Sequence, residues 1–124
     1  MYFLDTNALI WLYQGEIEKF TSETKLCLEV NDLYISPLVK LELQYLYEVN
    51  RISEKAEKII KKLYETIGLS IHNAPLVLLV EKALHADWTR DPFDRLITAH
   101  ALLEDAYLVT KDKTILTHYK KAIW

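Results

Sequence analysis

Glycine and cysteine are scarce in this chain, and each shortage excludes a class of site. Only Gly15 and Gly68 occur among the 124 residues, whereas a Walker loop or a dinucleotide-binding turn needs closely spaced glycines. The single cysteine, Cys27, forms neither an internal disulfide nor a thiolate zinc cluster, and one lone thiol is typical of a reducing compartment. We therefore expect no glycine-loop phosphate site and no cysteine zinc site.

Long hydrophobic runs are also missing. The longest unbroken apolar stretch, residues 74–80, is far shorter than the ~18 residues that indicate a membrane span. The N-terminus has no basic stretch ahead of an apolar one, so we expect no signal peptide. Apolar residues still make up 51% of the chain, enough for one core in a single domain spanning residues 1–124. These features predict a cytoplasmic protein without membrane contact.

Short apolar runs alternate with helical patterns along the chain. We expect strands at 2–4, 33–36, 69–71 and 107–110, and helices at 8–13, 16–30, 37–49, 54–67, 75–86 and 91–104. Ser53 is expected to cap the helix at 54–67, which Gly68 ends. This alternation predicts an α/β protein, a three-layer α/β/α sandwich around a central, mainly parallel sheet. In such sheets ligands usually bind at the edge formed by the strand C-termini.

Four acids are predicted to meet at that edge. Asp5 follows the first strand, and Asp112 lies two residues beyond the last one. Asp94 is the third residue of a helix that opens with Asp91-Pro92. Glu42 falls at about 40° on a helical wheel with Leu38 at zero, near the middle of an apolar stripe. That stripe consists of Leu38, Leu41, Tyr45, Leu46 and Val49.

Each acid also has a purely structural explanation. Asp5 suits an Asx cap, Asp112 suits an ordinary turn, and Asp91 with Asp94 resembles a capping box. Glu42 can extend from the edge of the stripe to solvent or pair with a buried cation. If the four carboxylates do converge, they raise one another's pKa unless a cation compensates them. All-oxygen ligands favour Mg²⁺, with Mn²⁺ as a second option, and no paired histidines or cysteines favour zinc.

Four stretches are distinctive in combination: Leu4-Asp5-Thr6-Asn7-Ala8, Glu42 within 36–43, Arg90-Asp91-Pro92-Phe93-Asp94-Arg95, and Leu108-Val109-Thr110-Lys111-Asp112. On these motifs, and over essentially all 124 residues, the chain resembles PIN-domain ribonucleases of the VapC toxin type. The resemblance implies a Mg²⁺-dependent endoribonuclease whose metal-binding and catalytic acids are Asp5, Glu42, Asp94 and Asp112. It also implies that Thr6, Asn7 and Thr110 orient those acids. Asp91 remains a ligand, a cap or an electrostatic helper.

The same resemblance implies partners. VapC-type toxins form homodimers and are bound by a cognate VapB-type antitoxin that lies across the active site. Their products carry a 5′-phosphate and a 3′-hydroxyl. Two other functions stay open at this point. One is a PIN domain with little or no catalysis that binds RNA or protein. The other is a phospho-receiver domain, which is disfavoured because no aspartate closes the third expected strand.

The formal net charge of −3 argues at first against an RNA partner. Setting the four proposed ligands aside leaves 14 acids against 15 Lys and Arg residues, so the remaining chain is balanced. Cations for RNA phosphates are expected from Arg90, Arg95, Lys111 and Lys113, which flank two of the acids. The segment from Pro75 to Trp88 contains more apolar residues than a surface helix needs, which predicts that it is buried in the core or in an interface. The four histidines are expected to be ordinary surface or hydrogen-bonded core residues.

Overall fold

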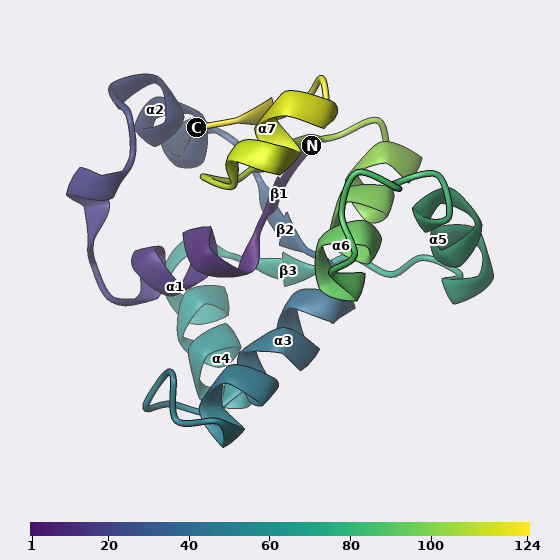
Figure 1. Cartoon of the computed structure of the whole chain (residues 1–124). Helices are drawn as coiled ribbons and strands as arrows, with labels where there is room; N and C mark the ends of the chain where they lie inside the picture. Colours follow the sequence, from purple (N-terminus) through teal and green to yellow (C-terminus); the bar gives the residue numbers. More distant parts are fainter.

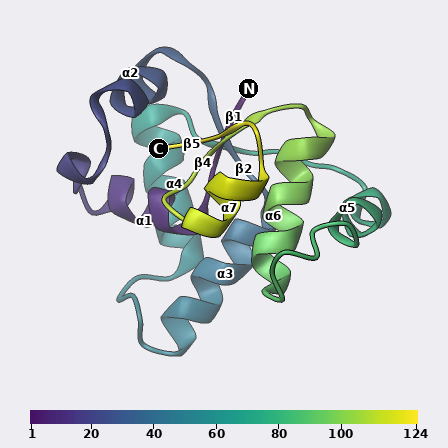
Figure 2. The same ribbon diagram turned by 45° about the horizontal axis from the view of Figure 1, so that its top comes forward.

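The computed structural model describes all 124 residues and contains a five-stranded sheet in which every neighbouring pair is parallel. The strand order is β3-β2-β1-β4-β5; Figure 1 labels β1, β2 and β3, and Figure 2 labels β4 and β5. The strands are β1 (Tyr2–Leu4), β2 (Leu33–Ile35), β3 (Ser70–Ile71), β4 (Tyr107–Val109) and β5 (Ala122–Ile123). With helices flanking this sheet, the predicted three-layer α/β/α class is confirmed.

Seven α-helices and one 3₁₀ turn connect the strands. They are α1 (Thr6–Tyr13), η1 (Ile17–Lys19), α2 (Ser22–Val30), α3 (Pro37–Glu48), α4 (Ala56–Ile67), α5 (Leu76–Ala83), α6 (Pro92–Leu103) and α7 (Lys113–His118). Helices α1, α3 and α4 contact one another, and α5 packs on α6, an arrangement visible in Figures 1 and 2. No helix is both long and apolar enough to cross a bilayer.

Local sequence signals explain where several helices begin and end. Ser36 caps α3 with its side chain, and a proline follows at the first helical position, where its missing N–H costs nothing. Asp91 and Pro92 begin α6 in the same way. Gly68 ends α4 at a φ of 71°, a left-handed conformation that favours glycine.

The sheet places the ends of β1 and β4 at a topological switch point. The chain runs outward from β1 to β2 and β3, then returns to lay β4 against the other side of β1. Phe3 and Leu4 on β1, and Leu108 and Val109 on β4, have no exposed surface, as expected for parallel strands covered on both faces. Open α/β sheets bind ligands just outside such a switch point. The residues that follow β1 and β4 are therefore the candidates for the functional site.

Some predicted helix boundaries are wrong. The helix expected at 16–30 is split, because the 3₁₀ turn η1 precedes α2 and Thr21 caps α2 with its hydroxyl. Ser53 does not cap α4, which begins at Ala56 after Lys55 without a side-chain cap. Helix α7 and strand β5 were not predicted. Both are very short, so they contain too few residues for a recognisable periodicity.

The apolar stripe predicted for α3 is also wrong. Leu41, Tyr45 and Val49 are exposed at 58%, 52% and 45%, whereas Val39 and Leu43 are fully buried. Apolar residues occur almost all round this helix, so the pattern alone does not select the packed face. The buried face lies one position away from the predicted one. Glu42 consequently flanks the core and is half-buried rather than centred in it.

Helix α5 is largely exposed. Leu79 and Ala83 are buried, but Leu76, Val77 and Leu84 are exposed at 61%, 64% and 67%. The predicted alternatives were burial in the core or in an interface, and the first of these is excluded for most of the helix. The apolar face of α5 is thus left without a partner inside the chain.

Candidate active site at the β1–β4 switch point

Asp5 is the buried centre of the acidic cluster. Its side chain is 7% exposed; Oδ1 accepts a 2.7 Å hydrogen bond from the Thr6 backbone N–H, and Oδ2 accepts one of 2.7 Å from the Thr110 hydroxyl. Burial raises the pKa of Asp5, and the two hydrogen bonds oppose that rise. The carboxylates of Asp112 and Asp91 raise it further. Asp5 is therefore held in place by two hydrogen bonds, but no cationic side chain forms an ion pair with it.

Glu42 is linked to Asp5 through Thr6. The Thr6 hydroxyl donates a hydrogen bond to Glu42 Oε1, while the Thr6 backbone N–H serves Asp5. Burial is the main cause that raises the pKa of Glu42, the Thr6 hydrogen bond lowers it, and Asp5 and Asp91 raise it again. A single threonine thus orients two carboxylates on two different helices.

Asp112 and Asp91 both cap helices. Asp112 Oδ1 accepts a 2.9 Å hydrogen bond from the Ile115 N–H at the start of α7, and its own N–H donates to the Thr110 hydroxyl at 3.0 Å. Asp91 Oδ1 accepts hydrogen bonds from the N–H groups of Phe93 and Asp94 at 2.8 and 3.1 Å. The capping geometry anticipated for Asp91 is present. Each cap uses Oδ1 alone, so the second carboxylate oxygen of each residue makes no hydrogen bond within the protein.

Asp94 also has a raised pKa. Burial raises that pKa to about 7, and Asp91, Asp5, Asp112 and Glu42 all add to the increase through like-charge repulsion. The electrostatic influence of these four acids on Asp94 indicates that the five carboxylates share one region. Unlike Asp5, the Asp94 carboxylate accepts no hydrogen bond that would lower its pKa. A cation is the simplest way to relieve this repulsion.

The protein's own cations do not neutralise the acids. The four ion pairs of the molecule are Lys40–Glu57, Lys58–Glu54, His72–Glu104 and Lys121–Asp105. Arg90 donates to the carbonyl of Asp87 at 2.7 Å, and Arg95 donates to that of Thr89 at 2.8 Å. Of the four cations proposed for RNA, these two therefore hold the loop before α6. Lys111 and Lys113 are exposed beside Asp112.

The donor set fits a hard divalent ion that keeps part of its water shell. All candidate ligands are carboxylates, which Mg²⁺ and Mn²⁺ prefer. No three of them bring one oxygen each within 4.8 Å of one another, so direct ligation by all four acids needs side-chain movement or bridging water. Asn7, which was grouped with the orienting residues, is exposed in the first turn of α1. Thr6 and Thr110 are buried and make the orienting hydrogen bonds.

A second cluster of metal-ligating side chains lies on α6 and after β3. His100 is fully buried, and its Nε2 lies 3.1 Å from Nδ1 of His72. Glu104 Oε2 lies 3.9 Å from Nε2 of His72, and the three residues form a group that could hold an ion. Burial, with a smaller contribution from His72, lowers the pKa of His100 to about 4. This group could not be predicted from local sequence, because 28 positions separate the two histidines.

Comparisons with solved structures agree with the fold. The chain is structurally similar to VapBC2 from Rickettsia felis bound to a promoter DNA fragment, with a TM-score of 0.70, 21% identity, and coverage of 99% of this chain and 96% of that one. A toxin–antitoxin complex from Klebsiella pneumoniae matches with a TM-score of 0.64 and 18% identity, covering 100% of this chain and 97% of that one. DNA-bound VapBC from Salmonella typhimurium matches with a TM-score of 0.62 and 17% identity, covering 98% of this chain and 93% of that one. At these identities the likeness establishes the fold.

The sequence itself identifies the family. No curated protein matches the chain, but the family model described as "PIN domain" matches residues 2–121. That match covers β1 through α7, including every acid at the switch point. The chain therefore belongs to the PIN domain family.

Proposed function

We propose that this protein is a Mg²⁺-dependent endoribonuclease that hydrolyses RNA phosphodiester bonds. The observation that carries the proposal is the group of acids at the β1–β4 switch point, where burial and the repulsion of neighbouring acids together raise the pKa of Asp94 to about 7 and no acid has a cationic partner in the chain. A site that concentrates negative charge in this way is suited to a divalent cation. Membership of the PIN domain family supports the same activity.

Asp5, Glu42, Asp94 and Asp112 would hold the ion, with Mn²⁺ as an alternative to Mg²⁺. When bound, such an ion supplies Lewis-acid activation of water and neutralises charge on the phosphate. Thr6 and Thr110 fix the carboxylates of Asp5 and Glu42 before substrate arrives. Such preorganisation lowers the cost of reaching the transition state. Asn7 and Asp91 complete the supporting layer, Asp91 through its cap on α6.

Water is the attacking group in this proposal. It adds in line to phosphorus and breaks the bond to the 3′ oxygen, which gives a 5′-phosphate and a 3′-hydroxyl. Asp94 or Asp112 accepts the water's proton. Lys111 and Lys113 provide charge for the flanking phosphates, while Arg90 and Arg95 shape the loop that leads to Asp94.

We further propose that the protein acts in the cytoplasm as the toxin of a VapBC-type pair and forms a homodimer. Two of the similar structures are named as VapBC, and a third as a toxin–antitoxin complex. Their coverage of nearly the whole chain supports a comparable partner, a VapB-type antitoxin. The exposed apolar side chains of Leu76, Val77 and Leu84 on α5 offer a surface for the second copy.

A PIN domain with little or no catalysis, binding RNA or protein, is the competing function. The observation in its favour is that no three site carboxylates bring their oxygens within 4.8 Å of one another. The two functions are separated by incubating the purified protein with end-labelled single-stranded RNA in Mg²⁺, in EDTA, and in EDTA followed by excess Mg²⁺. Catalysis predicts cleavage that EDTA stops and Mg²⁺ restores, with 5′-phosphorylated products. Intact RNA under all three conditions, with RNA still bound, would establish the binding module instead.

A further inference from the structure

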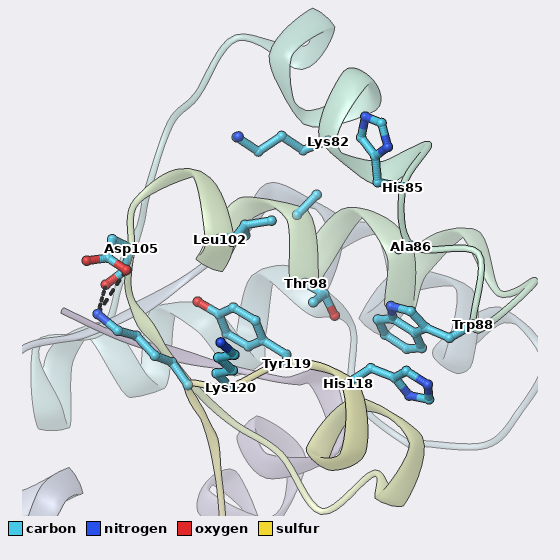
Figure 3. Close-up of a pocket in the computed structure, with 12 residues that line it drawn as sticks. Lys82, His85, Ala86, Trp88, Thr98, Leu102, Asp105, His118, Tyr119 and Lys120 are labelled. Carbon is cyan, nitrogen blue, oxygen red and sulfur yellow. Dashed lines mark hydrogen bonds and ion pairs between the residues drawn. The ribbon is translucent and has the colours of Figure 1, made fainter.

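An open pocket of about 440 Å³ lies between the end of α5, the middle of α6 and the segment after α7. Figure 3 shows its residues, which come from all three of these elements. Its volume is within the range of ~300–1,000 Å³ typical of small-ligand sites. None of the acids at the switch point lines it, so it requires an explanation of its own.

Helices α6 and α7 contribute residues to the pocket and also carry or follow acids of the acidic site. Asp94 lies in the first turn of α6, and Thr98, which lines the pocket, follows one turn later on the same helix. One turn of an α-helix advances by about 5.4 Å. Asp112 caps α7, and His118 and Tyr119 at the other end of α7 also line the pocket. The pocket and the acidic site therefore share the elements α6 and α7.

Thr98 supplies a polar group that the protein itself does not satisfy. Its side chain is 5% exposed, and its Oγ1 has no hydrogen-bond partner. In Figure 3 this oxygen is directed toward the gap between Tyr119 and Trp88. An unsatisfied buried hydroxyl normally lowers stability, so its presence in a pocket wall needs a reason. This oxygen has almost no accessible surface in the free protein, so pairing with a nucleobase requires rotation of the Thr98 side chain. Once turned into the pocket, a hydroxyl both donates and accepts, which lets it pair with either kind of edge group on a nucleobase.

Aromatic and cationic side chains surround that hydroxyl. The indole of Trp88 is stacked on the ring of His118, with centroids 5.1 Å apart and planes 7° from parallel, so Trp88 already accepts a planar ring. Lys82 and Lys120 stand on the rim without acidic partners. The acid on the rim, Asp105, is paired with Lys121 at 2.9 Å. The pocket thus offers stacking surface together with net positive charge.

We propose that this pocket is a subsite for one unpaired nucleobase of the RNA strand, next to the phosphate held at the acidic site. The base stacks against Trp88, hydrogen-bonds to the Thr98 hydroxyl, and places its sugar-phosphate near Lys82 and Lys120. Such a subsite selects single-stranded or flipped-out nucleotides, because a paired base is not free to enter. The proposal rests on the ribonuclease function proposed above.

Binding measurements in the cleavage-deficient Asp5→Asn background test the subsite separately from catalysis. The probes are a fluorescein-labelled RNA dodecamer and an abasic ribose-phosphate dodecamer of equal charge. Thr98→Val is the sharpest variant, because it removes a hydroxyl that has no partner in the protein. We expect an unchanged or higher Tm and ~3–10-fold weaker RNA binding. Thr66→Val, on the exposed side of α4, is the matched control and should bind like the parent.

Trp88→Leu should weaken RNA binding by at least ~5-fold, as loss of one stacked base predicts. Both pocket variants should bind the abasic strand as the parent does. Equal affinity of the parent for the two strands, or full RNA affinity in Thr98→Val and Trp88→Leu, would overturn the subsite even if the wild-type protein cleaves RNA. Base-dependent binding that Thr98→Val weakens, in a protein that cleaves nothing, would support the subsite and refute the proposed catalysis.

Discussion

The Thr110 hydroxyl donates a 2.7 Å hydrogen bond to Asp5 Oδ2 and joins residues 105 positions apart in the chain. Asp5 follows β1 and Thr110 follows β4, and these two strands are neighbours in the sheet. The same Thr110 oxygen accepts a hydrogen bond from the Asp112 N–H. Thr110 therefore connects the two ends of the switch point and sets the position of two acids at once.

Thr110→Val should reduce RNA cleavage by about 10–100-fold, the usual cost of losing a group that orients a metal ligand. Stability should fall by about 1–3 kcal/mol, because Asp5 loses a buried hydrogen-bond donor. Cleavage rates and urea unfolding measure the two effects. Thr117→Val is the control, since that hydroxyl is exposed and bonds only to the Lys113 carbonyl. Full activity in Thr110→Val would show that the hydrogen bond is dispensable.

Without divalent metal, the contribution of Asp94 to stability should decline as pH rises from about 4 to 7. The pKa of Asp94 is raised from 3.8 to about 7, so in this window the folded state holds a proton that the unfolded chain has released. Asp94→Asn should therefore flatten the decline and raise Tm at pH 8 in EDTA. Because Asp94 is partly exposed, we expect a gain on the order of 1 kcal/mol. Thermal melts across this pH range, with and without Mg²⁺, measure it; an unchanged slope in the variant would contradict the assignment.

His100 predicts the opposite pH dependence. Its pKa is lowered to about 4 from 6.5, mainly by burial and then by His72. Between these values the unfolded chain binds a proton that folded His100 refuses, so its contribution to stability is complete above pH 6.5 and is lost as pH falls toward 4. His100→Leu should make the free energy of unfolding less sensitive to pH in that interval. Denaturant titrations at several pH values test this, and a steeper acid-side loss in the variant would be the contrary result.

The apolar face of α5 should mediate dimerisation. Val77→Glu and Leu84→Glu place a charge on side chains that are 64% and 67% exposed in the monomer, so folding should be preserved while association is lost. Sedimentation velocity at micromolar concentration should give a dimer for wild type and a monomer for both variants. Ile67→Glu, which alters an exposed apolar residue at the end of α4, should remain dimeric. A wild-type monomer would remove this part of the proposal.

Chain order and local pattern were sufficient to predict the fold class and the four main strands. Strand-helix alternation with capping residues such as Ser36 and Asp91 is local information, and the parallel sheet follows from it. The packed face of α3 was not predictable, because Val39 and Leu41 are equally apolar and only tertiary contacts bury the first and expose the second. Likewise, strand β5 is too short to carry a pattern.

The candidate site was partly accessible to sequence reasoning. Asp5 and Asp112 could be placed because each follows a strand. Glu42 was assigned to the correct helix, but its position in the middle of an apolar stripe was predicted wrongly, because Leu41 and Tyr45 of that stripe are exposed. The Thr110 bridge to Asp5 was expected only from family resemblance, since nothing local links residues so far apart. Thr98 and Trp88 were not singled out, because an unsatisfied hydroxyl and a pocket are properties of packing. The His72–His100 contact was missed for the same reason.

Initial rates of RNA cleavage in Mg²⁺ by the wild-type protein, Asp5→Asn and Asp32→Asn test the central claim most directly. Asp5 is buried at the switch point, whereas Asp32 is an exposed aspartate ahead of β2. Both variants remove one negative charge, so a general charge effect would change them alike. We expect Asp5→Asn to stay folded and to cleave RNA at least ~100-fold more slowly than wild type, whereas Asp32→Asn should cleave like wild type. A folded Asp5→Asn that retains wild-type cleavage would contradict the central claim.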